Sequence, residues 1–132
     1  MDFKDKIVLI TGASSGIGKE AAIQFAKKGS NVILVARRRQ KLEQIADDLK
    51  KYNISTLVCE CDVSDKLQVE KMSKLVLEKY GSIDILVNNA GFAIYGSVFD
   101  LTTEEIESQM ATNYLGMIYC IKNLLPSMLK KK

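Results

Sequence analysis

Three glycines fall within eight residues near the start of the chain, in the segment Thr11-Gly12-Ala13-Ser14-Ser15-Gly16-Ile17-Gly18. An apolar run that predicts a buried strand precedes this segment, and a stretch that predicts a helix follows it. Glycines lack Cβ atoms, so the backbone of such a turn can approach a phosphate closely, and the free N–H groups of the helix that follows attract negative charge. The segment is therefore a candidate phosphate cradle. A plain flexible loop would also be rich in glycine, so the interpretation depends on the other segments.

Basic side chains follow the second predicted strand, residues 31–36. Arg37 lies roughly 20 residues beyond the glycine turn, where a dinucleotide-binding fold places an acid for the ribose 2′-hydroxyl of NAD. A guanidinium instead offers two donors to a 2′-phosphate, so Arg37 and Arg38 favour NADP(H) over NAD(H). The alternative is an ordinary solvated basic run. It is weakened because Arg38 and Arg39 come near the start of a predicted helix, where the helix dipole disfavours cations.

The spacing Gly-x-x-x-Gly-x-Gly differs from the Gly-x-Gly-x-x-Gly of larger dinucleotide-binding dehydrogenases. Together with Asn88-Asn89-Ala90-Gly91 after the fourth predicted strand, it resembles the short-chain dehydrogenase/reductase family, and the resemblance covers almost all 132 residues. It implies an oxidoreductase that transfers hydride between NADP(H) and a carbonyl or alcohol substrate. The residues expected at the cofactor are Gly12, Ser14, Ser15, Gly16, Ile17, Gly18, Arg37, Arg38, Asp62, Val63, Asn89, Ala90 and Gly91.

The resemblance also implies individual roles. Asp62 would accept a hydrogen bond from the adenine amino group with Val63 beside the ring, and Asn89 would lie against the nicotinamide-side ribose. Asp62 could also bond backbone N–H groups in a turn or at a helix N-terminus, and adjacent amides can satisfy the backbone where a strand ends. The family places an asparagine at Asn113, where it distorts the helix and holds a water of the proton relay. We expect Asn113 on the apolar stripe of the last helix, so the alternative is an ordinary hydrogen-bonded polar residue.

These candidates must be positioned by the elements around them. Four strand-like runs, residues 6–10, 31–36, 55–61 and 83–87, alternate with helical stretches. This alternation predicts an α/β fold, a Rossmann-like doubly wound parallel sheet with strand order 3-2-1-4. The glycine turn and the Asn-Asn-Ala-Gly loop would then be the two walls of the crevice where the order reverses.

The helices are expected to begin at the glycine turn, to cover residues 40–52 and 66–80, and to start again at the capping box Thr102-Thr103-Glu104-Glu105. The apolar stripe of the first is expected to comprise Ile17, Ala21 and Phe25, and that of the last Ile106, Met110, Met117 and Ile121.

Composition excludes several classes of protein. With 47% apolar residues, residues 1–132 should form one soluble domain, the N-terminal portion of an NADP(H)-binding Rossmann fold. The net charge of +3 is too small for a nucleic-acid surface, and the apolar runs fall far short of the roughly 20 residues that cross a bilayer. No signal-peptide pattern is recognisable, so we expect a cytoplasmic location and neither a nucleic-acid nor a membrane partner. Three cysteines and no histidine predict reduced thiols and no metal site.

A proton donor for carbonyl chemistry is missing from the sequence. The family uses a tyrosine with a lysine four residues later and an upstream serine. Here the residues four positions after the five tyrosines are Thr56, Asp84, Phe99, Ile118 and Asn123. We expect the catalytic segment outside this chain, in an enzyme about twice as long that forms a homodimer or homotetramer, and we expect residues 1–132 alone to be inactive. The rival interpretation is a non-catalytic dinucleotide-binding or assembly module.

Overall fold

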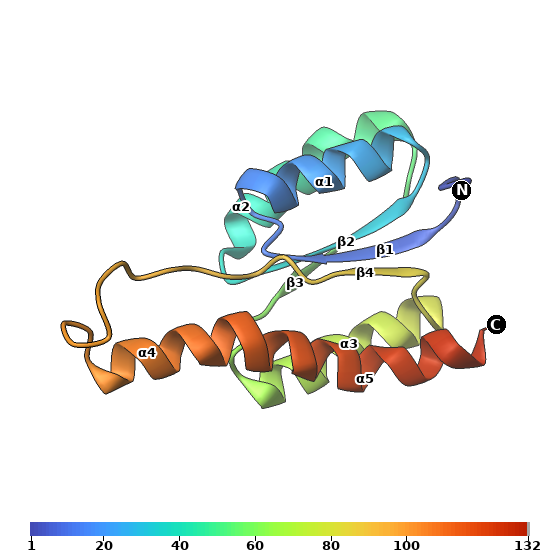
Figure 1. The fold of residues 1–132 in the computed structure, drawn as a ribbon. Coiled ribbons are helices and arrows are strands. Elements are labelled where there is room, and N and C mark those ends of the chain that lie inside the picture. The colour runs from blue at the N-terminus through green and yellow to red at the C-terminus, as the bar shows by residue number, and fades with distance from the viewer. Residues whose placement is uncertain (132) are drawn as a thin grey trace.

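A four-stranded parallel sheet is the middle layer of the chain, whose computed structural model describes residues 1–131 (Figure 1). The strands are β1 (Ile7–Thr11), β2 (Asn31–Ala36), β3 (Thr56–Glu60) and β4 (Ile85–Val87), in the order β3-β2-β1-β4. The predicted fold class and strand order are therefore confirmed. The register pairs Leu9 of β1 with Ile33 of β2 and Leu86 of β4. Strands with nearly continuous apolar sequences are expected where helices cover both faces of a sheet.

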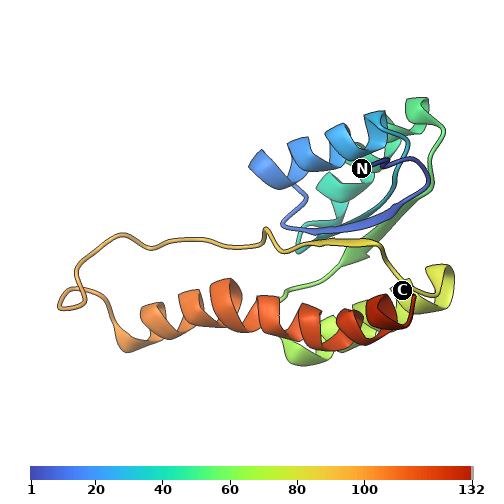
Figure 2. The same cartoon turned by 45° about the vertical axis from the view of Figure 1, so that its right-hand side comes forward.

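Helices cover both faces. α1 (Gly16–Lys27) and α2 (Arg39–Leu49) lie on one face, while α3 (Lys66–Tyr80) and α5 (Gly116–Lys130) lie on the other (Figures 1 and 2). A short 3₁₀ turn, η1 (Lys50–Tyr52), extends α2 and accounts for the longer helix predicted there. Each face of the sheet has its own apolar core, so the strands are sandwiched between two buried clusters.

The first helix buries the predicted face only in part, because Ala21 and Phe25 are half-buried against the core. Its buried residues are Gly18, Ala22 and Ala26, while Ile17 is 81% exposed. Small residues four apart allow the helix backbone to approach the sheet closely, and a Cβ at Gly18 would overlap the Gly12 carbonyl oxygen. Close approach, rather than a stripe of large apolar side chains, selects this face.

The last predicted helix is interrupted. α4 (Thr103–Met110), with the expected capping box at Thr102, passes through the π-helical segment η2 (Ala111–Leu115) into α5. The predicted apolar stripe is wrong, because Met110 is 52% exposed and the buried residues of α5 are Gly116, Cys120 and Leu124. A π turn accommodates an extra residue, so a period of 3.6 does not continue through it. In addition, α4 extends beyond the end of the sheet (Figures 1 and 2).

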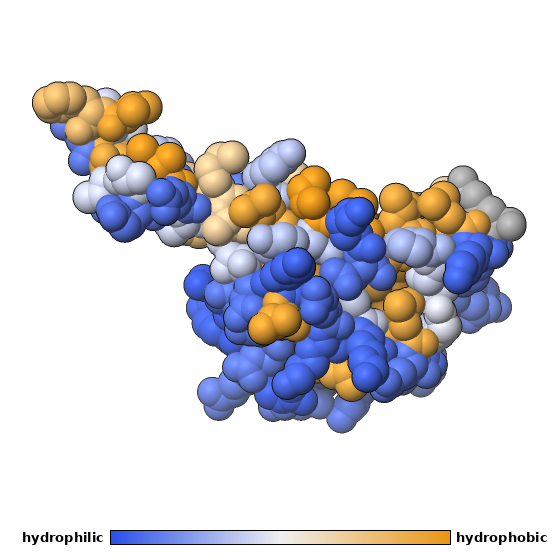
Figure 3. Space-filling view, turned by 90° about the horizontal axis from the view of Figure 1, so that it is seen from below, coloured by the Kyte–Doolittle hydropathy of each residue, from blue (hydrophilic) through white to orange (hydrophobic). Residues whose placement is uncertain are grey.

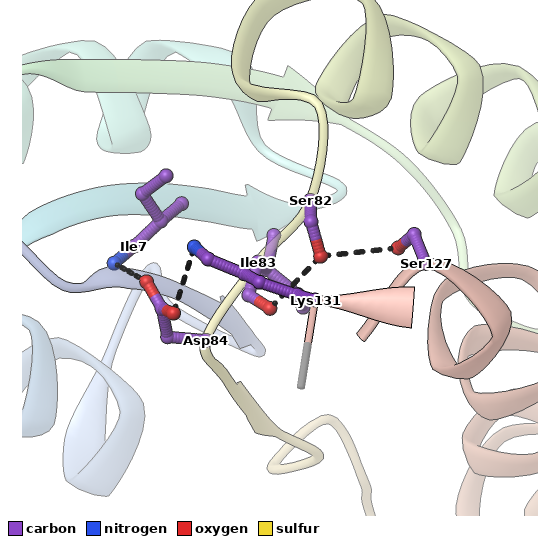
Figure 4. Close-up of polar contacts among 6 residues, drawn as sticks. All are labelled: Ile7, Ser82, Ile83, Asp84, Ser127 and Lys131. Atoms are coloured by element: carbon purple, nitrogen blue, oxygen red, sulfur yellow. Dashed lines mark hydrogen bonds and ion pairs between the residues drawn. The ribbon is translucent and has the colours of Figure 1, made fainter. Parts of the chain in front are cut away.

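Polar contacts tie the end of α5 to the start of β4 (Figure 4). The Asp84 carboxylate accepts from the Ile7 N–H at 2.8 Å and pairs with the Lys131 ammonium at 2.8 Å, while the hydroxyls of Ser82 and Ser127 are 3.4 Å apart. Burial alone would raise the pKa of Asp84, but the hydrogen bonds from Lys131 and Ile7 outweigh it and lower that pKa. These contacts hold α5 against the edge of the sheet. None of the described helices is both long and apolar enough to cross a bilayer.

Candidate functional site

A cleft of about 330 Å³ opens at the carboxyl ends of the strands. Its volume lies within the range of small-molecule sites, roughly 300–1,000 Å³. Four segments that follow four different strands line it, and we call this cleft the strand-end cleft. Its lining comprises Gly12, Ser14, Ser15, Ile17, Val35, Ala36, Arg37, Arg38, Cys61, Asp62, Val63, Asn89, Ala90, Gly91, Phe92 and Thr112. The structure thus brings together every predicted cofactor residue except Gly16 and Gly18, which shape the turn without lining the cleft.

The glycine turn uses its glycines in three different ways. Gly12 has φ +64°, and a Cβ there would lie 2.9 Å from the Ala90 Cα, so this position requires both the left-handed conformation and the small size of glycine. Gly16 has φ +55°, and a Cβ there would meet no atom within 4 Å, so only its backbone conformation demands glycine. Gly18 permits the close packing of α1 described above.

The N-terminus of α1 is open to an anion. Its N-cap residue, Ser15, makes no side-chain hydrogen bond to the first turn, and that turn contains no acidic residue. The first N–H groups of a helix lack partners within the helix, and they carry the positive end of its dipole. An anionic ligand in the strand-end cleft would meet these donors.

A threonine joins the two walls of the cleft. The Thr11 hydroxyl, at the end of β1, accepts from the backbone N–H groups of Asn89 and Ala90, both at 3.0 Å. The Asn89 side-chain amide donates in turn to the Gly12 carbonyl at 3.3 Å. Sequence reasoning missed this role of Thr11, because a threonine at the end of a β-branched run is typical of an ordinary strand. The only available signal was a hydroxyl at the last strand position before the glycine turn.

Arg37 and Arg38 form a cationic wall. Both are exposed and line the cleft, and neither forms an ion pair with a residue that the structure describes. Arg38 Nη2 lies 3.4 Å from Ser14 Oγ, which places this guanidinium beside the glycine turn. The next residue, Arg39, instead pairs with Glu43 at 3.0 Å along α2. Two guanidinium groups therefore stand uncompensated at the cleft.

Asp62 has the turn role that the sequence left open. Its Oδ1 accepts from the Ser64 backbone N–H at 3.0 Å and from the Ser64 hydroxyl at 2.7 Å. The N-cap of α3 is Asp65, whose side chain accepts from Leu67 and Gln68 N–H groups, so neither Asp62 nor Ser64 caps the helix. Because no hydrogen bond within the described residues uses Asp62 Oδ2, that oxygen is available to a ligand in the cleft.

Val63 and Cys61 form apolar lining on either side of Asp62. Val63 is held by the close approach of α5, since a Cβ at Gly116 would lie 2.7 Å from Val63 Cγ2. Burial, with the nearby Cys120 and Asp62 adding to it, raises the pKa of the Cys61 thiol to about 12. Burial likewise raises the pKa of Cys59 and of Cys120 to about 11. All three cysteines are therefore protonated near neutral pH, and within residues 1–131 no group of acidic or sulfur ligands is arranged to hold a metal ion.

Asn113 lies in the π-helical segment η2, so the helix is distorted at this residue. The expectation that it occupies a buried stripe is wrong, because it is exposed and lies outside the cleft lining. Its side chain bonds both backbone groups of Phe92: Oδ1 accepts from the N–H at 2.9 Å, and Nδ2 donates to the carbonyl at 2.7 Å. The amide thus uses one acceptor site and one donor to hold the segment that follows Gly91.

The chain shares this architecture with known proteins, and its sequence is similar to theirs. A family model described as short chain dehydrogenase matches residues 6–132. Meso-2,3-butanediol dehydrogenase of Serratia marcescens is 37% identical over all of this chain and 52% of its own length. An alcohol dehydrogenase of Thermococcus sibiricus, solved with 5-hydroxy-NADP, is 36% identical with a TM-score of 0.93 over 95% of this chain and 54% of that protein.

Other solved relatives carry either kind of cofactor. L-sorbose reductase of Gluconobacter frateurii, in complex with NADPH and L-sorbose, is 31% identical with a TM-score of 0.94 over 99% of this chain and 51% of that protein. A xylitol dehydrogenase bound to NAD⁺ is 26% identical with a TM-score of 0.93 over 99% of this chain and 51% of that protein. The chain spans about half the length of the relatives it matches. It belongs to the short-chain dehydrogenase family, whose members are oxidoreductases.

Proposed function

We propose that residues 1–132 bind NADP(H), with NAD(H) as the weaker ligand, and form the cofactor-binding portion of an oxidoreductase acting on a carbonyl or alcohol. The observation that carries this proposal is the pairing of two anion sites in one cleft. The uncapped N-terminus of α1 lies beside the uncompensated guanidinium groups of Arg37 and Arg38. A pyrophosphate at the helix and a 2′-phosphate at the arginines would satisfy both sites.

The strand order supports one orientation of the ligand. Asp62 follows β3 and Arg37 follows β2, while Asn89 follows β4, on the opposite side of the glycine turn. The adenosine end would therefore lie against Asp62 and Val63, with the free Asp62 Oδ2 accepting from the adenine amino group. The nicotinamide end would lie over β4, beside Asn89, Ala90 and Gly91. When bound, the cofactor supplies or accepts the hydride.

The other parts of the proposal concern the complete enzyme. Because this chain contains no tyrosine followed by a lysine four residues later, we propose that residues 1–132 supply the cofactor half and do not turn over substrate alone. Asn113 would contribute to the proton relay. We also propose a cytoplasmic homo-oligomer, dimer or tetramer, with a small-molecule substrate and neither nucleic-acid nor membrane partners.

One observation favours the second candidate, a non-catalytic assembly module. Large apolar side chains are exposed on the arm formed by the loop between β4 and α4, where Tyr95, Val98 and Phe99 are each more than four-fifths exposed. Figure 3 shows apolar side chains gathered at this protruding end of the molecule. Exposed apolar patches mark interaction surfaces, so this arm is the feature that an assembly function would use.

Cofactor preference tests the leading proposal directly. We expect Arg37→Asp to weaken NADPH binding by about 1.5–3 kcal/mol, roughly 10- to 150-fold, as for the loss of a hydrogen bond to a charged group. NADH, which lacks the 2′-phosphate, should lose much less. The matched control is Arg39→Asp, which makes the same charge change at an arginine that pairs with Glu43 outside the cleft lining. Titration of all three proteins with both cofactors measures the effect. Equal losses of affinity for NADPH and NADH would show that Arg37 does not bind the 2′-phosphate.

A further inference from the structure

The segment after Gly91 crosses from the sheet to α4 without regular structure of its own. Backbone N–H and carbonyl groups in such a segment need partners from elsewhere. Two residues of the segment find them on the helix that runs alongside. Phe92 is held by Asn113 through the two hydrogen bonds described above, and the half-buried Ile94 donates its N–H to Gln109 Oε1 at 3.0 Å.

Gln109 is itself fixed on the helix. Its Nε2 donates to the Glu105 carbonyl one turn earlier, at 3.2 Å, so the orientation of the amide that faces Ile94 is set. Glu105 is in turn part of the capping box at the start of α4, where its side chain accepts from the Thr102 N–H at 2.9 Å. A continuous set of hydrogen bonds thus runs from the N-terminus of α4 to the loop.

The spacing of these two amides matches the extended chain beside them. Residues four apart on a helix are separated by about 6 Å along its axis, and residues two apart in an extended chain by about 6.5 Å. Gln109 and Asn113 therefore meet alternate residues, Ile94 and Phe92, of a segment that runs in the opposite direction. The pair of side-chain amides, which we call the amide ladder, takes the place of a neighbouring strand.

We propose that Gln109 is a positioning residue for the nicotinamide end of the cofactor site, acting through the segment from Gly91 to Ile94. Gly91 and Phe92 line the strand-end cleft, on the β4 side of the glycine turn. Gly91 also lets the ladder approach, because a Cβ there would lie 3.0 Å from Asn113 Oδ1. With Asn113 alone, the segment would be held only at Phe92 and could rotate about that residue. The hydrogen bond from Ile94 to Gln109 fixes a second residue of the segment, so the wall of the cleft is held in one position.

The inference rests on the proposed function, because it assumes that a dinucleotide spans the cleft. Loss of the ladder should therefore weaken the binding of the nicotinamide end of that ligand and leave the binding of its adenosine end unchanged. The arginines and Asp62, at the adenosine end, follow β2 and β3 and make no hydrogen bond to the ladder within the described residues.

The experiment compares NADPH with 2′,5′-ADP, which carries the 2′-phosphate and adenosine but no nicotinamide. Gln109→Met keeps the length of the side chain and removes its acceptor. We expect NADPH to bind about three- to tenfold more weakly, as for one lost hydrogen bond, and 2′,5′-ADP to change less than about twofold. Gln109→Glu retains an acceptor oxygen for the Ile94 N–H but cannot donate to the Glu105 carbonyl, so it should restore NADPH binding in part. Glu107→Met places the same methionine on α4 away from the loop and should leave both affinities unchanged.

Equal weakening of both ligands, or unchanged NADPH binding in Gln109→Met, would overturn the inference. Failure of the wild-type protein to bind either ligand would overturn the proposed function itself, which is a distinguishable result. Hydrogen exchange provides a test without nucleotide. Gln109→Met should speed exchange of the Ile94 amide by about tenfold and leave the β2 amides Val32 to Val35 unchanged, and an unaltered Ile94 rate would refute the ladder.

Discussion

The Thr11 hydroxyl offers the sharpest test of how the two walls of the cleft are joined. Thr11 is 1% exposed, and its Oγ1 accepts from two backbone N–H groups, those of Asn89 and Ala90. Thr11→Val replaces the hydroxyl with a methyl of nearly the same size, so packing is retained while both donors lose their acceptor. A buried donor left without a partner costs about 1–3 kcal/mol. Because both N–H groups are only partly buried, we take about 1–1.5 kcal/mol for each and expect the two together to cost about 2–3 kcal/mol in the free energy of unfolding.

The assay is urea unfolding followed by far-ultraviolet circular dichroism, at two protein concentrations so that self-association is separated from stability. For a chain of this length, the expected loss corresponds to a fall in Tm of roughly 6–15 °C. Thr11→Ser is the matched control, because it keeps the acceptor and removes one methyl, at a cost of about 1 kcal/mol. If Thr11→Val destabilises the protein no more than Thr11→Ser does, the hydroxyl does not join the walls and the reasoning fails.

Two further predictions concern the glycine turn and the start of β4. Gly16→Val places a branched side chain at φ +55° beside the proposed phosphate site, where no protein atom opposes it, so cofactor affinity should fall at least about tenfold while the circular dichroism spectrum stays native. Unchanged affinity with a native spectrum would exclude the cradle. The lowered pKa of Asp84 contributes stability above its unfolded value of about 3.9, which is lost as the pH falls through the folded pKa. As the pH is lowered below about 4, the urea midpoint of Asp84→Asn should therefore fall less than that of the wild type. Parallel pH profiles of the two proteins would contradict this.

The sheet was predictable because its signals are local. Alternating apolar runs and helical stretches indicate parallel strands, and a glycine turn after the first of them gives the starting point of the crevice. The positions of Arg37, Asp62 and Asn89 in the strand-end cleft follow from the fact that each comes just after a strand. Side chains at the carboxyl ends of neighbouring parallel strands meet at the same edge, whatever lies between them in the sequence.

The features that the sequence did not predict depend on contacts between distant segments. The buried face of α1 is determined by the close approach of Gly18 to the Gly12 carbonyl. A periodicity of large apolar residues does not indicate such a contact. Asn113 was expected on a buried stripe, but the π turn that contains it and the position of α4 beyond the sheet place it on the surface. Gln109 gave no signal at all, because its role exists only when the loop after β4 lies alongside the helix.

These long-range contacts also bear on how the site forms. Thr11 and Asn89 are 78 residues apart in the chain, and Phe92 and Asn113 are 21 apart, so the wall formed by the loop after β4 does not have its final shape until β4 has paired with β1. Contacts of such separation are made late, because the entropy of closing the intervening chain must first be overcome. The glycine turn, in contrast, is formed by β1 and α1 alone. A ligand stabilises the β1–β4 pairing only as far as it binds the paired state more tightly than the state in which that pairing has opened. NADPH, which would touch both walls, should therefore stabilise the β1–β4 pairing more than 2′,5′-ADP does at equal saturation.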